Sequence, residues 1–307
     1  MEKCEYSNRF LKYPCNRYEE QGKGGFCIFH CDDEEKKKFN EEFWKEFEKQ
    51  EKDNNQKKFE FVWFKFPDGF SFEEKEFKKP VNFPVATFSG EANFGGATFS
   101  GEAYFPGATF SGEASFEGAT FSGEADFWGA TFSGEANFKD ATFSGEAYFW
   151  DATFSGKAYF WDATFSGEAN FGGATFSGKA NFKNATFSGK ANFWGAKFSD
   201  EASFENATFS DEASFENAKF TDILFVVTEF KKFVNFSHTS FKNSVRFEGG
   251  IKENGKINIA VFPTDKGYVD FSYAKFLDPK LVEFINVDLS RVSFLNSRLN
   301  DIRFSSD

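Results

Sequence analysis

The sequence has few histidines, methionines and cysteines, and it has no long apolar run. Its 307 residues include two His and one Met, and none of its four Cys lies beyond residue 31. The longest apolar run is about five residues, from Ile223 to Val227, whereas a helix needs about 20 apolar residues to span a bilayer. The first residues also lack the apolar core of a signal peptide. We therefore expect a cytoplasmic protein with no membrane segment in this chain.

Positive charge is also scarce. The chain has 36 basic and 48 acidic residues, a net charge of −12, and its isoelectric point is about 4.9. Residues 86–220 alone hold 18 acidic and 7 basic side chains, so nearly all of the excess negative charge lies there. Because nucleic acids and anionic lipids attract basic surfaces, this balance argues against direct binding to nucleic acid.

Phenylalanine, in contrast, is abundant and regularly spaced. The chain has 51 Phe, and twelve copies of an eleven-residue unit such as ATFSGEANFGG follow one another from Ala86 to Asn217. Successive Phe are alternately five and six residues apart, and this spacing already begins at Phe61. A period near five matches neither the 3.6-residue period of a helix nor the two-residue alternation of a strand.

The structure that fits this period is a solenoid whose sides are about five residues long. On each side the Phe and the Ala two residues before it point inward, the residue between them points outward, and Ser-Gly or Gly-Gly turns the corner. Coils of a β-solenoid stack about 4.8 Å apart, so identical inner side chains form ladders.

This pattern resembles the pentapeptide-repeat family, in which A-(D/N/T)-(L/F)-x-x is repeated with the third residue inward. The resemblance covers about residues 61–304 and is closest to the Phe-rich subgroup, whose repeats include six-residue units. It implies an all-β fold, a right-handed quadrilateral β-helix. We expect about 22 residues per coil over residues 59–248, a hairpin-like insertion over 249–268, and further coils over 269–307.

Residues 34–58 are predicted to form an amphipathic capping helix and a linker. Phe39, Phe43 and Phe47 recur every four residues, which places them on one face of a helix. Because an exposed coil edge is a template for aggregation, we expect this face to cover the first coil. The alternative is a stripe that binds a partner.

The only candidate metal ligands lie in residues 1–33. Cys27 and His30 form a C-x-x-H pair, and Cys4 and Cys15 would complete a tetrahedral site, with Cys31 as an alternative fourth ligand. Such a set suits a structural Zn²⁺, which would supply folding energy to a short polar segment. The segment also resembles the zinc-knuckle-like lead of many Phe-rich pentapeptide-repeat proteins. Unligated thiols and a disulfide are the alternatives.

No set of residues indicates catalysis. Apart from His30, the one other histidine is His238, so neither a Ser-His-Asp nor a Cys-His-Asn arrangement can be assembled. The sequence predicts that the protein is not an enzyme.

The 22-residue period also predicts what the outer surface presents. One outer column contains Glu91, Glu113, Glu135, Lys157, Lys179 and Glu201, and the opposite one contains Glu102, Glu124, Glu146, Glu168, Lys190 and Glu212. The candidate contact aromatics are Trp128, Trp150 and Trp194 in one column, Trp161 on the opposite side, and Tyr148 and Tyr159. Outward Trp side chains predict an aromatic docking strip. The alternative is that stacked indoles only protect the side wall.

These features predict a rigid acidic scaffold that binds a protein partner through its outer columns. The resemblance supplies an alternative, because some pentapeptide-repeat proteins mimic duplex DNA and bind type II topoisomerases such as gyrase. Lys157, Lys179 and Lys190 interrupt the negative charge where a mimic should be continuous. Two further expectations are that the chain is a cytoplasmic module of a larger membrane protein, and that it forms a homodimer through its C-terminal coil.

Overall fold

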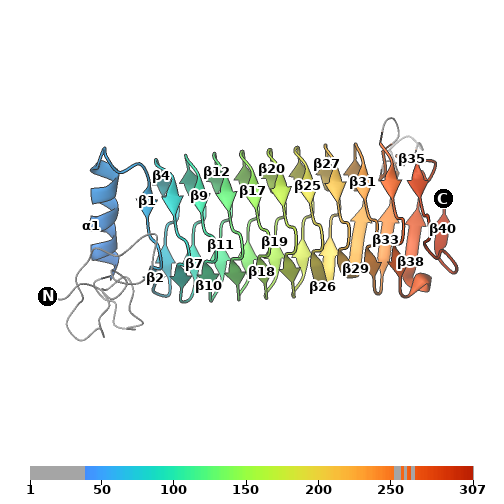
Figure 1. Ribbon diagram of the computed structural model, residues 1–307, viewed down its shortest axis with the longest axis horizontal. Helices are drawn as coiled ribbons and strands as arrows, with labels where there is room; N and C mark the ends of the chain where they lie inside the picture. Colours follow the sequence, from blue (N-terminus) through green and yellow to red (C-terminus); the bar gives the residue numbers. More distant parts are fainter. Residues whose placement is uncertain (1–38, 252–256, 259–260, 264–266, 307) are drawn as a thin grey trace.

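The computed structural model describes residues 39–251, 257–258, 261–263 and 267–306. The chain is a β-solenoid of about 11 turns with about 22 residues per turn. Figure 1 shows a straight rod of stacked coils, with the helix α1 (Phe39–Lys52) lying across the end where the coils begin. The predicted quadrilateral β-helix with a capping helix is confirmed.

Two opposite sides of each coil are built from strands that follow the A-x-F pattern. The first side is an 11-stranded sheet of β1 (Phe59–Glu60), β5 (Val81–Asn82), β9 (Ala103–Tyr104), β13 (Ala125–Asp126), β17 (Ala147–Tyr148), β21 (Ala169–Asn170), β25 (Ala191–Asn192), β28 (Ala213–Ser214), β31 (Val234–Asn235), β36 (Val269–Asp270) and β39 (Val292–Ser293). The third side contains β3 (Phe70–Ser71), β7 (Ala92–Asn93), β11 (Ala114–Ser115), β15 (Ala136–Asn137), β19 (Ala158–Tyr159), β23 (Ala180–Asn181), β33 (Val245–Glu248), β38 (Val282–Ile285) and β40 (Arg303–Ser305).

The other two sides are built mostly from Thr-Phe strands. The second side contains β2 (Lys65–Phe66), β6 (Thr87–Phe88), β10 (Thr109–Phe110), β14 (Thr131–Phe132), β18 (Thr153–Phe154), β22 (Thr175–Phe176), β32 (Ser240–Phe241) and β37 (Lys275–Phe276). The fourth side is an 8-stranded sheet of β4 (Glu76–Phe77), β8 (Thr98–Phe99), β12 (Thr120–Phe121), β16 (Thr142–Phe143), β20 (Thr164–Phe165), β24 (Thr186–Phe187), β27 (Thr208–Phe209) and β30 (Glu229–Phe230). Two longer strands, β26 (Lys197–Ser203) and β29 (Lys219–Val226), pass from the second side to the third and join them into one 19-stranded sheet.

The interior consists of ladders of stacked phenylalanine rings. Strands one coil apart pair in parallel, 22 residues apart, as Thr109 does with Thr131. The rings of Phe110 and Phe132 therefore lie 4.7 Å apart between centroids, with planes 1° from parallel. Rings of neighbouring ladders pack edge to face. Burying one such ring contributes about 1.5–3 kcal/mol, so the Phe ladders are the main stabilising feature of each coil.

The corners explain a second regularity of the sequence. The residue just before the Ala of an Ala-Thr-Phe side has a positive φ, for example 64° at Gly96, 56° at Asp140 and 56° at Asn184. Gly adopts this backbone conformation without cost, and Asn and Asp tolerate it better than other residues. The alternation of Gly, Asp and Asn at this position therefore follows from the corner geometry.

The helix α1 covers the open end of the first coil. Phe39, Phe43 and Phe47 are fully buried. The ring of Phe47 lies 4.5 Å from that of Phe59, and the ring of Phe43 lies 5.0 Å from that of Phe61. The aromatic face of the helix thus continues the Phe ladders, as predicted.

The last coils are less regular than the middle ones. The pairing register between β26 and β29 shifts by one residue. Phe198 pairs with Phe220, whereas Glu201 pairs with Asp222. Farther on, the antiparallel pair β34 (Gly250–Ile251) and β35 (Ile257–Asn258) interrupts the coils, and a short 3₁₀ helix spans Pro279–Leu281. In the final described coil Phe304 is 43% exposed. The ladder therefore ends with a partly exposed ring, unlike the end that α1 covers.

Candidate interaction face

The predicted metal ligands Cys4, Cys15, Cys27, His30 and Cys31 lie outside the described residues. Within the part of the chain that the structure describes, no group of three or more His, Cys, Asp or Glu side chains could hold a metal ion. The described candidate site is therefore on the outer walls of the rod.

Three tryptophans form a column on the first side of the rod. Trp128, Trp150 and Trp194 are 57%, 50% and 48% exposed. The backbone N–H groups of Gly107 and Gly129 donate to the carbonyl oxygens of Trp128 and Trp150, at 2.8 and 2.9 Å, which places these two tryptophans on consecutive coils. We call the outer surface of β9, β13, β17, β21 and β25, with the turns that follow these strands, the tryptophan face.

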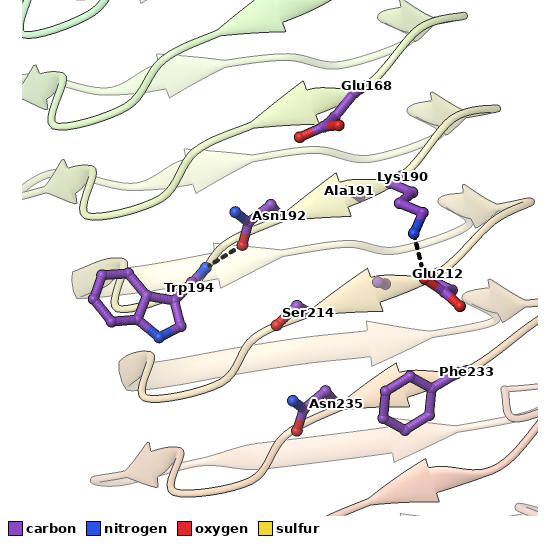
Figure 2. Close-up of a pocket in the computed structure, with 10 residues that line it drawn as sticks. Glu168, Lys190, Ala191, Asn192, Trp194, Glu212, Ser214, Phe233 and Asn235 are labelled. Atoms are coloured by element: carbon purple, nitrogen blue, oxygen red, sulfur yellow. Dashed lines mark hydrogen bonds and ion pairs between the residues drawn. The ribbon is translucent and has the colours of Figure 1, made fainter.

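Short polar side chains fix the backbone from which two of the indoles project. The Oδ1 atom of Asp126 accepts a hydrogen bond from the Trp128 N–H at 2.8 Å. Asn192 accepts the same bond from Trp194 at 2.9 Å (Figure 2). Because Asp and Asn close local turns in this way, the sequences DFW and NFW hold each Trp at a defined corner.

A column of carboxylates runs beside the tryptophans. It consists of Glu102, Glu124, Glu146 and Glu168, on consecutive coils. No described residue forms an ion pair with any of these four glutamates. Lys190 ends the column and binds Glu212 on the next coil, with 2.8 Å between Nζ and Oε2 (Figure 2).

Carboxylates on this face are partly buried and lie close to one another. Burial raises the pKa of Asp126. Burial and then the charges of Asp126, Glu146 and Glu102 raise the pKa of Glu124. The hydroxyl of Tyr148, which is half-buried, donates to Glu146, and this bond is the main cause of the raised pKa of Tyr148. A nearby cation would relieve the repulsion among these carboxylates.

The opposite wall presents its tryptophan differently. Trp161 is 39% exposed, and the Nζ atom of Lys139 lies 5.7 Å from the centroid of its ring. Lys139 also binds Glu117 at 3.1 Å, so that indole already has a cation beside it. The half-buried Tyr159 lies on the same wall, on β19.

Sequence reasoning missed two features of these walls. The first is the pair Tyr104 and Asp126, which lie between the predicted columns of the tryptophan face. The second is a contact, that of Lys139 with the Trp161 ring. The sequence does show that Lys139 and Trp161 are neighbours in one column, because they are 22 residues apart, but it does not specify the side-chain rotamer that brings them into contact.

A surface hollow of about 350 Å³ lies at the C-terminal end of the tryptophan face and extends beyond it onto β28 and β31. Trp194 lies at one side of the hollow and Phe233 at the other, with Asn235 and Ser214 between them (Figure 2). The wall therefore carries an acidic column and, at its C-terminal end, a concave part with an aromatic rim.

A chain of two-residue strands wound around four Phe ladders belongs to the class of β-solenoid repeat proteins. A family model described as pentapeptide repeats, with nine copies, matches residues 72–120, 83–131, 116–164 and 160–208. Over residues 72–208, which these matches span together, the chain is similar to pentapeptide repeats.

A solved structure that resembles the chain is HetL, a pentapeptide repeat protein involved in heterocyst differentiation regulation from the cyanobacterium Nostoc sp. strain PCC 7120. The two sequences are 10% identical, and the match covers 86% of this chain and 93% of HetL with a TM-score of 0.27. A likeness at this level carries no argument about function. No curated protein is similar enough to count as a relative. Within the described residues, no helix has the length and apolar character that a membrane crossing requires.

Proposed function

We propose that the chain is a non-enzymatic interaction scaffold that binds a protein partner through the tryptophan face. The observation that carries this proposal is the column of Trp128, Trp150 and Trp194, each about half exposed, on a wall built from repeated, hydrogen-bonded coils. Clustered exposed aromatic side chains mark contact surfaces, and Trp is enriched at the centre of protein interfaces. A rigid wall also loses little conformational entropy on binding.

Quantitative affinity capture from cells of the source organism tests the proposal. The wild-type protein is compared with the triple variant Trp128→Ala/Trp150→Ala/Trp194→Ala, and Trp161→Ala on the opposite wall is the control. We expect a partner that the wild type and the control retain and the triple variant loses. If all three proteins capture the same set, the indoles only protect the wall and the proposal is wrong.

We also propose that residues 1–33 bind one structural Zn²⁺ through Cys4, Cys15, Cys27 and His30, with Cys31 as the alternative fourth ligand. The donor set supports this proposal, because thiolate and imidazole are the preferred ligands of closed zinc sites. Metal analysis of the purified protein should find stoichiometric zinc in the wild type and less in Cys27→Ser. Wild-type protein without zinc would contradict the proposal.

DNA mimicry is a second candidate function, supported by the column from Glu102 to Glu168, which forms no ion pair with any described residue. A mimic would bind a type II topoisomerase in place of duplex DNA. A gyrase supercoiling assay with added protein tests this candidate, and unchanged supercoiling at micromolar protein would remove it. The lysines at 157, 179 and 190 break the negative charge on both walls, which favours the scaffold over the mimic.

The final described coil supports a homodimer as a further proposal. Leu295 is 61% exposed and Phe304 is 43% exposed, so pairing with a second copy would bury both side chains. Sedimentation over a range of concentrations should show a dimer that Leu295→Glu disrupts. A monomer at all concentrations would contradict this proposal.

A further inference from the structure

We infer that the segment bound by the tryptophan face is a flexible, lysine- or arginine-rich stretch of a protein. This inference rests on the proposed function, because it names the partner chemistry of the same face. It is carried by the combination of aligned, exposed indoles with a column of carboxylates.

The first step is the charge of the face. Glu102, Glu124, Glu146 and Glu168 lie on consecutive coils without an ion pair to any described residue. Burial, and then repulsion from neighbouring carboxylates, raises the pKa of Glu124. Lys190 lies at the end of this column, but its ammonium group binds Glu212. A basic ligand would therefore meet carboxylates that form no ion pair with a described cation.

The second step is the chemistry of the indoles. A Lys or Arg side chain over the face of a Trp ring is attracted by the ring quadrupole, and Trp is the best of the aromatic side chains for this contact. The protein uses this pairing on the opposite wall, where Lys139 lies over Trp161. Over Trp128, Trp150 and Trp194, no cation of the described residues takes that place. Among the described residues, the tryptophan face thus has the aromatic half of the contact without the cation.

The third step is geometry. The tryptophan column and the acidic column run side by side along the rod. The backbone N–H groups of Ala125 and Ala147 donate to the carbonyl oxygens of Glu146 and Glu168, which places successive glutamates on neighbouring coils. Coils about 4.8 Å apart place Glu102 and Glu168 ~14 Å from each other, a length that about five residues of extended chain cover at ~3.3 Å per residue. A short unfolded segment along the rod can therefore contact both columns, its cations reaching carboxylates and indoles alike.

The test measures binding of labelled flexible peptides to the whole chain by fluorescence anisotropy. One peptide alternates Lys with Ser, a second alternates Arg with Ser, and a neutral third has Gln in place of Lys. We expect both basic peptides to bind, with the affinity falling as salt is raised, and the neutral peptide not to bind. Failure of both basic peptides to bind would overturn the inference.

Matched double variants separate this face from the general negative charge of the rod. Glu124→Gln/Glu146→Gln removes two carboxylates from the tryptophan face, and Glu113→Gln/Glu135→Gln removes two from the opposite wall. We expect about tenfold weaker binding for the first and less than about threefold for the second. Equal weakening would mean that the peptides respond only to net charge, and the inference would be wrong.

A substitution of the indoles completes the test. Trp128→Leu/Trp150→Leu keeps the face apolar but removes the ring quadrupole, and Trp161→Leu is the control on the opposite wall. We expect the first variant alone to weaken binding, by about fivefold or more. Unchanged binding would exclude the indoles from the site. If affinity capture still depends on the tryptophan column while basic peptides do not bind, only the partner chemistry is wrong and the scaffold proposal stands.

Discussion

The tryptophan face and the wall opposite it share one interior but differ on the outside. Phe127, behind the tryptophan face, and Phe138, behind the opposite wall, are both fully buried and stack on the next coil at 5.0 and 4.9 Å. Outside, no cation of the described residues lies over the indoles of the first wall, whereas Lys139 lies over the indole of the second. The inner positions therefore determine the fold and leave the outer positions free to determine function.

The largest predicted effect tests whether the interior is really common to the two walls. Phe127→Ala and Phe138→Ala should each destabilise the protein by about 3–5 kcal/mol, because each leaves a cavity within a continuous ladder. Urea unfolding followed by circular dichroism measures both. The two losses should agree within about 1 kcal/mol, as expected for equivalent buried sites. A larger difference would show that the outer columns also contribute to the stability of one wall.

A smaller effect is predicted at the corners that lead into the two walls. A Cβ atom at Gly134 would lie 2.4 Å from the carbonyl oxygen of Gly112, and one at Gly123 would lie 2.8 Å from the carbonyl carbon of Gly101. Both are backbone contacts, so Gly134→Ala and Gly123→Ala should cost about 1–3 kcal/mol each. The loss should be larger at Gly134, where the approach is closer.

The control for the corner substitutions is Gly129→Asn. Gly129 has open space around it and a φ of 61°, and Asn occupies the corresponding corner elsewhere in the repeats, as at Asn184. Gly129→Asn should therefore unfold close to the wild type in the same urea experiment. Equal destabilisation by all three substitutions would mean that close backbone approach is not what requires glycine.

Much of the fold could be predicted from the sequence because a repetitive chain repeats its register. The alternation of five- and six-residue Phe spacings gives the length of each side, and the four sides that the family resemblance implies then give a coil of 22 residues. Every outer column follows from this length, including that of Trp128, Trp150 and Trp194. The cap was predictable for a similar reason, since Phe39 and Phe43 are one helical turn apart.

Features that interrupt the repeat could not be predicted. Phe230 stacks on Phe262, with 6.4 Å between centroids, although the insertion that separates them follows no period. Thr228 and Thr239 replace inner Ala residues and are fully buried, because their hydroxyls donate to backbone carbonyl oxygens at 2.7 Å. In the candidate site, the contact of Lys139 with its indole depends on a side-chain rotamer, which the repeat does not specify. The zinc site stays a prediction.

A third prediction gives the tryptophan face the cation that the opposite wall already has. Pro106 lies 22 residues before Trp128, as Lys139 lies 22 residues before Trp161. In Pro106→Lys, the new ammonium group should lie over the Trp128 ring and compete with a basic peptide for that contact, a loss of about 0.5–1 kcal/mol or two- to fivefold in affinity. Peptide titration measures the effect, and Pro106→Gln is the neutral control. Equal affinities of the Lys and Gln variants would contradict the prediction.

The smallest predicted effect concerns pH. Burial raises the pKa of Asp126, so the folded state binds this proton more tightly than the unfolded state, and stability falls as pH rises through the unfolded and then the folded pKa. The corresponding residue of the opposite wall is the uncharged Asn137, whose amide donates to Glu117. Asp126→Asn should therefore place the same uncharged residue at this position of both walls. It should stabilise the protein at neutral pH by up to about 0.5 kcal/mol. The turn should survive, since Asn192 accepts the same backbone bond from Trp194.

Thermal unfolding of both proteins from acidic to neutral pH measures the effect. The gain should disappear in acid, where Asp126 is protonated, and a gain that persists there would show that burial of the charge is not its cause.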